Sequence, residues 1–291
     1  MNMKLLPTLN CMIVLMRWNF LEGSRKDSEQ TTTLAETTGA ELGSVTVTKK
    51  LFPPAVLADL RSIKNEARRI IQAATLPWDD IGGRILPTAS FASFQKKMMK
   101  LEERLELAIR EMVDNYDAIK DEARIRLNGL FNESEFPTRE DIKDAYKMVL
   151  KYTPVPRGEH ITLDALSDAD QKMLKDELDS TTEAQFNEAH KENYRRLLDT
   201  VMKLFGRLGT DKDGKPEVFQ SSTVNNLLEV LENGKALNIL NDPKLDEMID
   251  TLKGDLEDMD IDALRHDPRH RFGVRASLKD TVDRISEMGV F

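Results

Sequence analysis

Residues 89–128, ASFASFQKKMMKLEERLELAIREMVDNYDAIKDEARIRLN, are the stretch that decides the fold. Apolar side chains recur in it at spacings of three and four residues, and neither Gly nor Pro interrupts the pattern. A pattern with this period predicts one amphipathic helix. Such a helix would be about 60 Å long, whereas a compact domain of this size measures only about 40 Å across. The apolar face of the helix therefore requires a partner along its length.

The partner of this helix can be another helix of the same chain or another copy of the chain. Leu107, Ile109 and Val113 widen the apolar stripe beyond a strict two-position seam. A wide stripe favours a helical bundle or a higher oligomer over a two-stranded coiled coil. We therefore expect the stripe to mediate oligomerisation, and its candidate residues are Phe94, Met98, Leu101, Leu105, Met112, Tyr116 and Ile119.

Before this helix, the sequence predicts two strands and one helix. Residues 10–20 contain six consecutive apolar residues, and residues 44–48 alternate and are β-branched, so both favour strands that pair with each other. Pro53-Pro54 opens a helix that reaches Ala74, and a turn-rich loop follows at 78–84. The fold class is mostly α with a small N-terminal β element (α+β), with the long central helix packed in a helical bundle.

Helical patterns also dominate the rest of the chain. Thr138-x-x-Asp141 begins a helix that we expect to continue to residue 152. Further helices are predicted at 167–179, 182–208, 221–233 (ending at Asn233-Gly234), from Asp242-Pro243, and from Ser277-x-x-Asp280. We divide the chain into an N-terminal strand pair plus helix (1–87), the long central helix and the helix after it (88–152), a proline-rich linker (153–162) and a C-terminal helical region (163–291).

Composition excludes several classes of protein. The chain has 291 residues, with 42 Lys and Arg against 51 Asp and Glu, a formal net charge of −9. This acidic balance argues against a protein that coats nucleic acid by neutralising phosphates, and 6% aromatic residues disfavour a stacking platform for single strands. A single cysteine, Cys11, excludes an internal disulfide framework. No apolar run reaches the roughly 18 residues of a membrane span, so we expect a cytoplasmic protein without membrane contact.

Two segments carry residue types that could support chemistry. Gly209 to Lys215 has the glycine and lysine spacing of a phosphate-binding loop, but Pro216 follows and a helix precedes it, so a tight turn is favoured. Residues 257–262 concentrate four carboxylates, which are typical of a helix end followed by a capped helix start. No Ser-His-Asp or Cys-His constellation is present, and the four histidines are scattered. We expect no catalytic residue, no metal and no cofactor; a metal-dependent hydrolase that uses the acids at 257–262 is an alternative.

Arginine is concentrated at two places in this acidic chain. Residues 265–275 hold four arginines and two histidines, which we interpret as a basic loop. The exposed face of the helix from Pro54 to Ala74 carries the second group, which consists of Arg61, Lys64, Arg68 and Arg69. Arg84 follows Gly82-Gly83, where the backbone can approach a partner closely. Arginine forks bind carboxylates and phosphates. The candidate residues for binding a partner or an anion are therefore Arg84, Arg265, Arg269, His270, Arg271 and Arg275. A nucleic-acid-binding accessory protein is the alternative function that these clusters suggest.

Several short segments together resemble one known family. They are Leu9-Asn10-Cys11-Met12-Ile13-Val14, Gly23-Ser24-Arg25-Lys26, Val45-Thr46-Val47 before Pro53-Pro54, Gly82-Gly83-Arg84-Ile85-Leu86-Pro87, Leu237-Asn238-Ile239, Asp242-Pro243, Leu264-Arg265 and Arg271. The family is a bacterial and phage domain of unknown function, often encoded beside MoxR-type AAA+ ATPases and von Willebrand A-type proteins. The resemblance implies a role that depends on a partner, and it brings no catalytic residues.

These observations lead to one main expectation about function. The long stripe and the lack of catalytic constellations favour a non-enzymatic, oligomerising scaffold or adaptor in a phage or mobile-element system. The resemblance implies that it acts with an AAA+ ATPase, and the basic residues at 265–275 would offer a contact.

Overall fold

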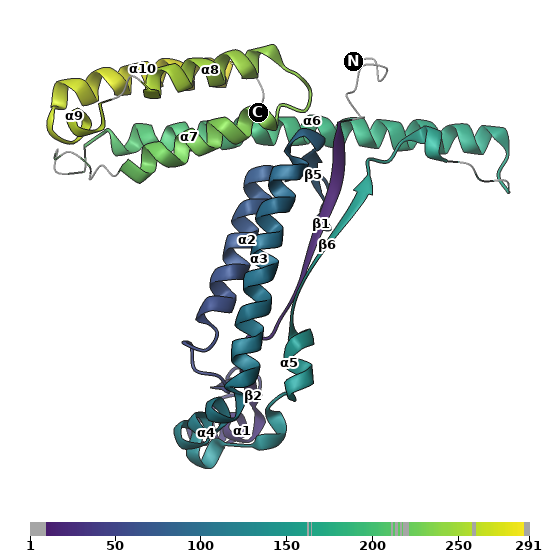
Figure 1. Ribbon diagram of the computed structural model, residues 1–291, viewed down its shortest axis with the longest axis vertical. Coiled ribbons are helices and arrows are strands. Elements are labelled where there is room, and N and C mark those ends of the chain that lie inside the picture. Colours follow the sequence, from purple (N-terminus) through teal and green to yellow (C-terminus); the bar gives the residue numbers. More distant parts are fainter. Residues whose placement is uncertain are drawn as a thin grey trace. The chain divides into compact units, whose positions relative to one another are not determined.

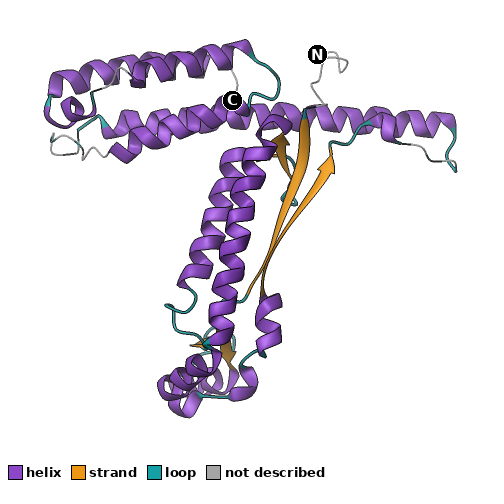
Figure 2. Cartoon of the chain, in the orientation of Figure 1, coloured by secondary structure: helices purple, strands orange, loops and turns teal. Residues whose placement is uncertain are grey.

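The apolar run that starts at Cys11 forms a strand, as its composition predicts. The computed structural model describes residues 10–161, 163, 165–210, 212, 215, 217, 221–257 and 260–287. Strand β1 (Cys11–Phe20) pairs antiparallel with β5 (Arg84–Pro87). The sheet order is β4-β5-β1-β6, with β4 (Leu76–Pro77) and β6 (Tyr146–Pro154) at its edges. The strands are drawn in orange in Figure 2, where β1 and β6 are the two long ones. A strand with apolar residues on both faces thus lies inside the sheet.

The expected pairing of the two N-terminal strands is wrong. The second strand, β3 (Val47–Lys50), pairs instead with β2 (Ser24–Asp27) in a separate two-stranded ribbon. Gly23, at a φ of +68°, lies between β1 and β2, and a turn of this hand is one that glycine adopts without strain. The Ser-Arg-Lys-Asp sequence of β2 contains no β-branched or aromatic residue, so it carries no strand signal. Helix α1 (Ser28–Thr38) follows β2 directly.

The long central helix forms, but it is interrupted once. It consists of α3 (Thr88–Asp114) and α4 (Tyr116–Leu127), and it follows α2 (Ala58–Ala74) in the chain. At the interruption, the Asn115 side-chain amide donates to the carbonyl oxygen of Glu111 over 2.9 Å. Asparagine competes in this way for backbone groups inside helices. The prediction of one unbroken helix to residue 128 is therefore wrong at Asn115.

The helix predicted from Thr138 to residue 152 is wrong over its second half. Helix α5 (Arg139–Ala145) begins with the predicted capping box, in which Thr138 and Asp141 exchange hydrogen bonds. The chain then becomes strand β6, where Tyr146 and Met148 alternate with exposed lysines. The Tyr146 hydroxyl donates to the carbonyl oxygen of Leu21 over 3.0 Å. This period-two burial overrides the helical spacing of the same residues.

The two helices predicted at 167–179 and 182–208 are one helix, α6 (Asp168–Arg207). Neither Gly nor Pro lies between them, and the Thr182 hydroxyl donates to the carbonyl oxygen of Pro156 over 3.2 Å. Forty residues correspond to about 60 Å of helix. In Figure 1, helices α7 (Ser221–Ala236), α8 (Pro243–Glu257) and α10 (Pro268–Glu287) lie beside the C-terminal half of α6.

Two further predictions about the C-terminal helices are corrected. Helix α7 does not end at Gly234; there the missing side chain lets Ile249 and Asn193 approach, and Asn193 donates to the Gly234 carbonyl oxygen over 3.0 Å. Residues 265–275 are not a loop, because they belong to α9 (Ile261–His266) and α10. Ser277 therefore lies inside α10 rather than at its start.

The described chain divides into two compact units, each built from separate segments. One unit comprises the described residues of Met1–Leu15, Ile71–Phe94 and Lys151–Phe291, and the other comprises Met16–Ile70 and Gln95–Leu150. The short helices η2 (Asn128–Leu130) and η3 (Glu133–Glu135) belong to the second unit, and η4 (Gly158–His160) belongs to the first. The protein is mostly α with a small antiparallel sheet, so the predicted fold class is confirmed.

Hydrophobic cores lie inside each unit. In the first unit, the C-terminal half of α6 packs on α7, α8 and α10 around Leu204, Leu227 and Ile249, which are fully buried. In the second unit, the ring of buried Phe52 makes edge contacts with Tyr116 of α4 and with Phe136. Among the described helices, none combines the length and apolarity needed to cross a bilayer.

Candidate functional site

The apolar stripe of α3 and α4 is used inside the chain. Every residue predicted to mediate oligomerisation is buried in the single chain, with exposed fractions from 1% to 8%, namely Phe94, Met98, Leu101, Leu105, Met112, Tyr116 and Ile119. Helix α2 lies beside α3 (Figure 1), and Arg104 of α3 contacts Glu66 of α2 at 2.6 Å. Other segments of the same chain therefore cover the stripe.

The Arg84 side chain caps the end of a helix. Its Nε donates to the Thr75 hydroxyl over 2.6 Å and its Nη2 to the Thr75 carbonyl oxygen over 3.1 Å, just after α2 ends. Arg196 of α6 donates to the same carbonyl oxygen over 2.9 Å. Burial, and to a lesser degree the nearby charge of Arg196, lower the pKa of Arg84 to about 10. Two cations at a helix C-terminus complement the helix dipole, so Arg84 has a structural role here.

The loop before Arg84 is a braced turn. The Asp79 carboxylate accepts hydrogen bonds from the backbone N–H groups of Ile81 (3.1 Å) and Gly83 (2.7 Å). Gly82 has a φ of +98°, and a side chain at Gly83 would meet the Asp79 carboxylate. Ile81, at the tip, is 86% exposed. The two glycines expected to permit a close approach of the backbone thus serve the turn itself.

The predicted basic residues of the C-terminal region point in different directions. Arg271 is 6% exposed, and its Nη2 donates to the carbonyl oxygens of Glu217 (2.7 Å) and Arg207 (3.2 Å). The guanidinium of Arg275 lies over the Phe205 ring, 4.4 Å from its centroid. Both side chains therefore tie α10 to the end of α6, whereas their neighbour Arg269 is exposed.

The remaining residues of that region differ in exposure. His270 is half-buried, and its Nε2 atom has no hydrogen-bond partner among the described residues. Phe272 is 76% exposed, one turn of α10 after Arg269. The Arg265 side chain lies outside the described residues. The structure thus does not gather these residues into one binding site.

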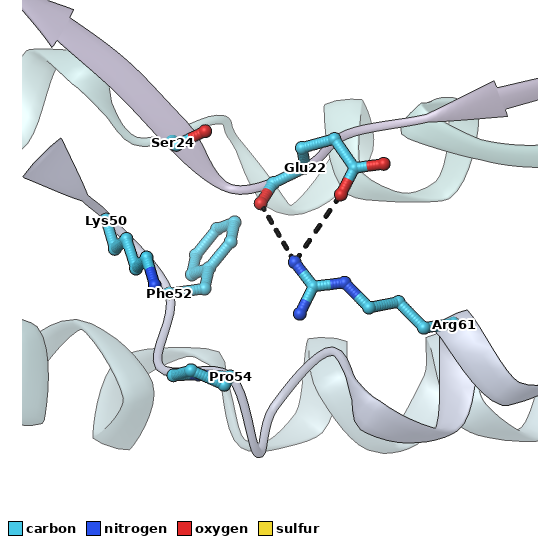
Figure 3. Close-up of a pocket in the computed structure, with 6 residues that line it drawn as sticks. All are labelled: Glu22, Ser24, Lys50, Phe52, Pro54 and Arg61. Atoms are coloured by element: carbon cyan, nitrogen blue, oxygen red, sulfur yellow. Dashed lines mark hydrogen bonds and ion pairs between the residues drawn. The ribbon is translucent and has the colours of Figure 1, made fainter. Parts of the chain in front are cut away.

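A pocket of about 120 Å³ opens in the second unit, where the β2–β3 ribbon meets the start of α2 (Figure 3). Its lining residues are Glu22, Ser24, Lys50, Phe52, Pro54 and Arg61. Arg61 reaches toward Glu22 from α2, with its Nη2 3.4 Å from Glu22 Oε2 and 3.5 Å from the Glu22 carbonyl oxygen (Figure 3). Lys64, one turn later, contacts the other carboxylate oxygen at 3.3 Å.

The ribbon beside this pocket has one covered face and one exposed face. On the covered face, Lys49 lies 2.9 Å from Glu135 and 3.5 Å from Asp27, and these contacts, Glu135 first, raise its pKa. The strand register pairs Ser24 with Lys50 and Lys26 with Thr48 on the other face, and all four are exposed. The exposed face therefore carries positive charge that no described acidic side chain pairs with.

Comparison with known families adds one finding to this geometry. A family-wide sequence profile, described as "Protein of unknown function (DUF3150)", matches residues 9–264. The chain belongs to the DUF3150 family. No curated protein and no solved structure matches it. The DUF3150 match covers the pocket, the whole ribbon and α6, but it ends before Arg269 and Phe272.

Within the DUF3150 region, the structure also joins three residues that the sequence did not bring together. The Oδ2 atom of Asp242 accepts a hydrogen bond from the Tyr194 hydroxyl over 2.8 Å and lies 3.1 Å from His190 Nε2. Burial raises the pKa of Asp242, but the hydrogen bonds from Tyr194, the Lys244 backbone and His190 outweigh it and hold the pKa below its usual range. Burial also raises the pKa of Tyr194.

The sequence contained only half of the signal for this cluster. His190 and Tyr194 are four residues apart, which places them on one face of a helix. Asp242 was recognisable as a helix cap, and it does begin α8, but nothing in the sequence shows that α8 starts beside these residues of α6. The cluster joins three titratable side chains across 52 residues, and its observed contacts fix the start of α8 against α6.

The described residues bear on the metal-binding and phosphate-loop hypotheses only in part. In the part that the structure describes, no group of three or more His, Cys, Asp or Glu side chains is placed to hold a metal ion. The carboxylate segment at 257–262 and the Gly209 to Lys215 stretch both lie partly outside the described residues.

Proposed function

We propose that this DUF3150 protein is a non-enzymatic scaffold or adaptor that assembles with itself through the N-terminal half of α6. The supporting observation is that α6 has no buried side chain between Asp168 and Thr181, although it has eight buried residues from Thr182 onward. These fourteen residues, about 21 Å of helix, bury no side chain of their own, although Gly158 and Leu166 contact them at Asp179 and Gln171. The surface that these contacts leave open is offered to a partner. An isolated helix of this length is marginal in water, and a packing partner would stabilise it.

The chemistry of this half-helix suits a second copy of the chain. Met173 is 60% exposed, and Leu174 and Leu178 are half-buried. A second copy that packs its own Met173, Leu174 and Leu178 on these side chains would bury the same surface on both copies, as in a two-fold dimer.

The partner and setting of this assembly follow from the sequence resemblance described above. We propose a MoxR-type AAA+ ATPase as the protein on which the scaffold acts, in the cytoplasm of a bacterial host and as part of a phage or mobile-element system. Phe272 and Arg269 offer exposed contacts for it on α10. Aromatic residues and arginine are the types most often found at the energetic centres of protein interfaces.

Light scattering on the purified full chain tests self-assembly. The wild type is expected to be a dimer or larger at high concentration, and Met173→Glu is expected to shift it toward the monomer. Met202→Glu is the matched control, because Met202 is 45% exposed on the C-terminal half of the same helix. A wild type that stays monomeric, or two variants that behave alike, would contradict the proposal.

The ATPase partner is tested separately, in a binding assay with a purified MoxR-type AAA+ ATPase. The expected result is direct binding that weakens in the double variant Arg269→Ala plus Phe272→Ala. If the variant bound the ATPase as well as the wild type does, α10 would not be the contact surface. If the wild type did not bind, the ATPase would not be a partner.

A further inference from the structure

The pocket of the second unit gathers hydrogen-bond donors that no described residue uses. Lys50 makes no ion pair with any described side chain, and the Ser24 hydroxyl makes no hydrogen bond to one. Arg61 uses only Nη2, and its two contacts, at 3.4 and 3.5 Å, lie at the outer limit of a hydrogen bond. The Nε and Nη1 donors of this guanidinium have no partner among the described residues. Three side chains therefore hold free donors at one cavity (Figure 3).

The charge around these donors is positive. Glu22 is the one carboxylate in the lining, and it is already shared between Arg61 and Lys64. Lys64 is held in place from a second side as well, because its Nζ lies 4.0 Å from the centroid of the Phe20 ring. Lys50, Arg61 and Lys64 are three cations against the one carboxylate of Glu22, so the group keeps two positive charges in excess that attract an anion.

The floor of the pocket is fixed before any ligand arrives. The carbonyl oxygen of Gly23 accepts hydrogen bonds from the backbone N–H groups of Leu51 (2.8 Å) and Phe52 (3.3 Å). Phe52 is 2% exposed and packs edge-on against Tyr116 and Phe136. A site whose backbone is already ordered loses less conformational entropy on binding.

We propose that this pocket binds the dianion of a phosphate monoester or of inorganic phosphate. Lys50 and Arg61 supply two positive charges, and the Ser24 hydroxyl supplies a third point of contact. A phosphate group carries close to two negative charges at neutral pH and has three acceptor oxygens, so it matches both the charge and the number of donors. A carboxylate has one charge and two oxygens, and a phosphate diester has one charge, so each leaves part of the site unsatisfied. This inference is independent of the proposed self-assembly, which uses α6 of the other unit.

NMR titration of the full chain tests the ligand class, with inorganic phosphate, adenosine monophosphate, dimethyl phosphate and acetate as probes at low salt. We expect phosphate and the monophosphate to shift the amide signals of Ser24 and Lys50 at millimolar concentrations. Dimethyl phosphate and acetate should shift them much less. Tighter binding of the nucleotide would identify a nucleotide as the natural source, and equal binding would identify free phosphate. The proposal would be overturned if phosphate caused no amide shifts, or if dimethyl phosphate caused shifts as large as those with phosphate.

The pH dependence of phosphate affinity reports the protonation state of the ligand itself. The second pKa of phosphate is about 6, so affinity should fall several-fold between about pH 7.5 and about pH 5. Binding that does not change over this range would mean that the monoanion is bound equally well, contrary to the proposal.

Substitutions at the exposed lining residues locate the site. Lys50→Gln and Arg61→Gln are each expected to weaken phosphate binding by about tenfold or more, and Ser24→Ala by less. Arg68→Gln is the matched control, since Arg68 is exposed two turns further along α2 and outside the lining. Retained amide spectra show that each variant is folded. If Lys50→Gln, Arg61→Gln and the control Arg68→Gln all weakened phosphate binding equally, the effect would come from the overall charge of the protein and not from this pocket. That result would also overturn the proposal.

Discussion

The Tyr194 hydroxyl donates a hydrogen bond to Oδ2 of Asp242 over 2.8 Å, across 48 residues of sequence. The same carboxylate caps α8, because its Oδ1 accepts from the Lys244 backbone N–H over 2.9 Å. One side chain thus starts a helix and ties that helix to α6.

Asp242→Ala is expected to destabilise the protein by about 2 kcal/mol, because it removes a helix cap and leaves the Tyr194 hydroxyl without its acceptor. The folded pKa of Asp242 is lowered, so its contribution is present above the unfolded value of about 3.9 and is lost as the pH falls through the folded pKa. Urea unfolding at several pH values checks this: the difference from wild type should disappear in strong acid. A difference that persists there would show that the charge is not the cause.

Lys49→Met is expected to lower the urea midpoint clearly, because it leaves Asp27, Glu135 and the Leu130 carbonyl oxygen without their shared partner. The pKa of Lys49 is raised, so its contribution is complete below the unfolded value of about 10.4 and is lost as the pH rises through the folded pKa. The adjacent and exposed Lys50→Met should change stability by no more than about 0.5 kcal/mol. If Lys49→Met and Lys50→Met lowered the urea midpoint equally, the stabilising role of the Lys49 contacts would be refuted.

Two glycine-to-alanine substitutions are expected to have opposite signs. A Cβ at Gly158 would lie 2.8 Å from the backbone oxygen of Lys175, so Gly158→Ala should destabilise by about 1–3 kcal/mol. Gly254 lies in α8 with nothing within 4 Å of its Cβ position, so Gly254→Ala should stabilise by about 0.5–1 kcal/mol. Thermal unfolding of both variants checks the pair, and the same sign for both would contradict the packing of residue 158 on α6.

Arg271→Ala should lower the free energy of unfolding by about 2–4 kcal/mol, because the carbonyl oxygens of Arg207 and Glu217 lose the buried guanidinium that donates to them. Arg269→Ala, two positions earlier and exposed, should be nearly neutral. Chemical denaturation distinguishes the two. If both variants were equally stable, the buried position of Arg271 would be wrong.

Cys11 should resist alkylation in the folded protein. It is 8% exposed, and burial raises the pKa of its thiol to about 11, so very little thiolate is present at neutral pH. Mass spectrometry after iodoacetamide treatment should show modification only when denaturant is added. Rapid labelling of the native protein would contradict the burial of β1.

The sequence largely predicted where helices form, but it did not predict which strands pair with each other. The Thr138 capping box and the Asp242-Pro243 helix start are local signals, and both are confirmed. Strand β6 was missed because Tyr146 and Val149 also fit a helical spacing, and its sheet environment depends on a strand more than 120 residues away. Ribbon strand β2 has no local signal at all.

The candidate sites show the same division between local and distant information. Arginine clusters were visible in the sequence, but the carbonyl oxygens that bind Arg84 and Arg271 are supplied by other parts of the chain. The pocket at Lys50 and Arg61 depends on a ribbon whose pairing was predicted wrongly. Local patterns identify charge, and only long-range packing decides which charges are free.

The alternation of the two units along the chain has a consequence for synthesis on the ribosome. Every residue of the second unit has been translated once Leu150 is added, whereas the first unit needs residues from both before and after it. Cys11 and Ile13 are therefore synthesised long before Phe186 and Leu237, and the core that these residues share cannot form until the later two have left the ribosome. A nascent chain that stalls after Leu150 and before Leu237 would expose the apolar side chains of β1, and we expect chaperones to bind it at that stage.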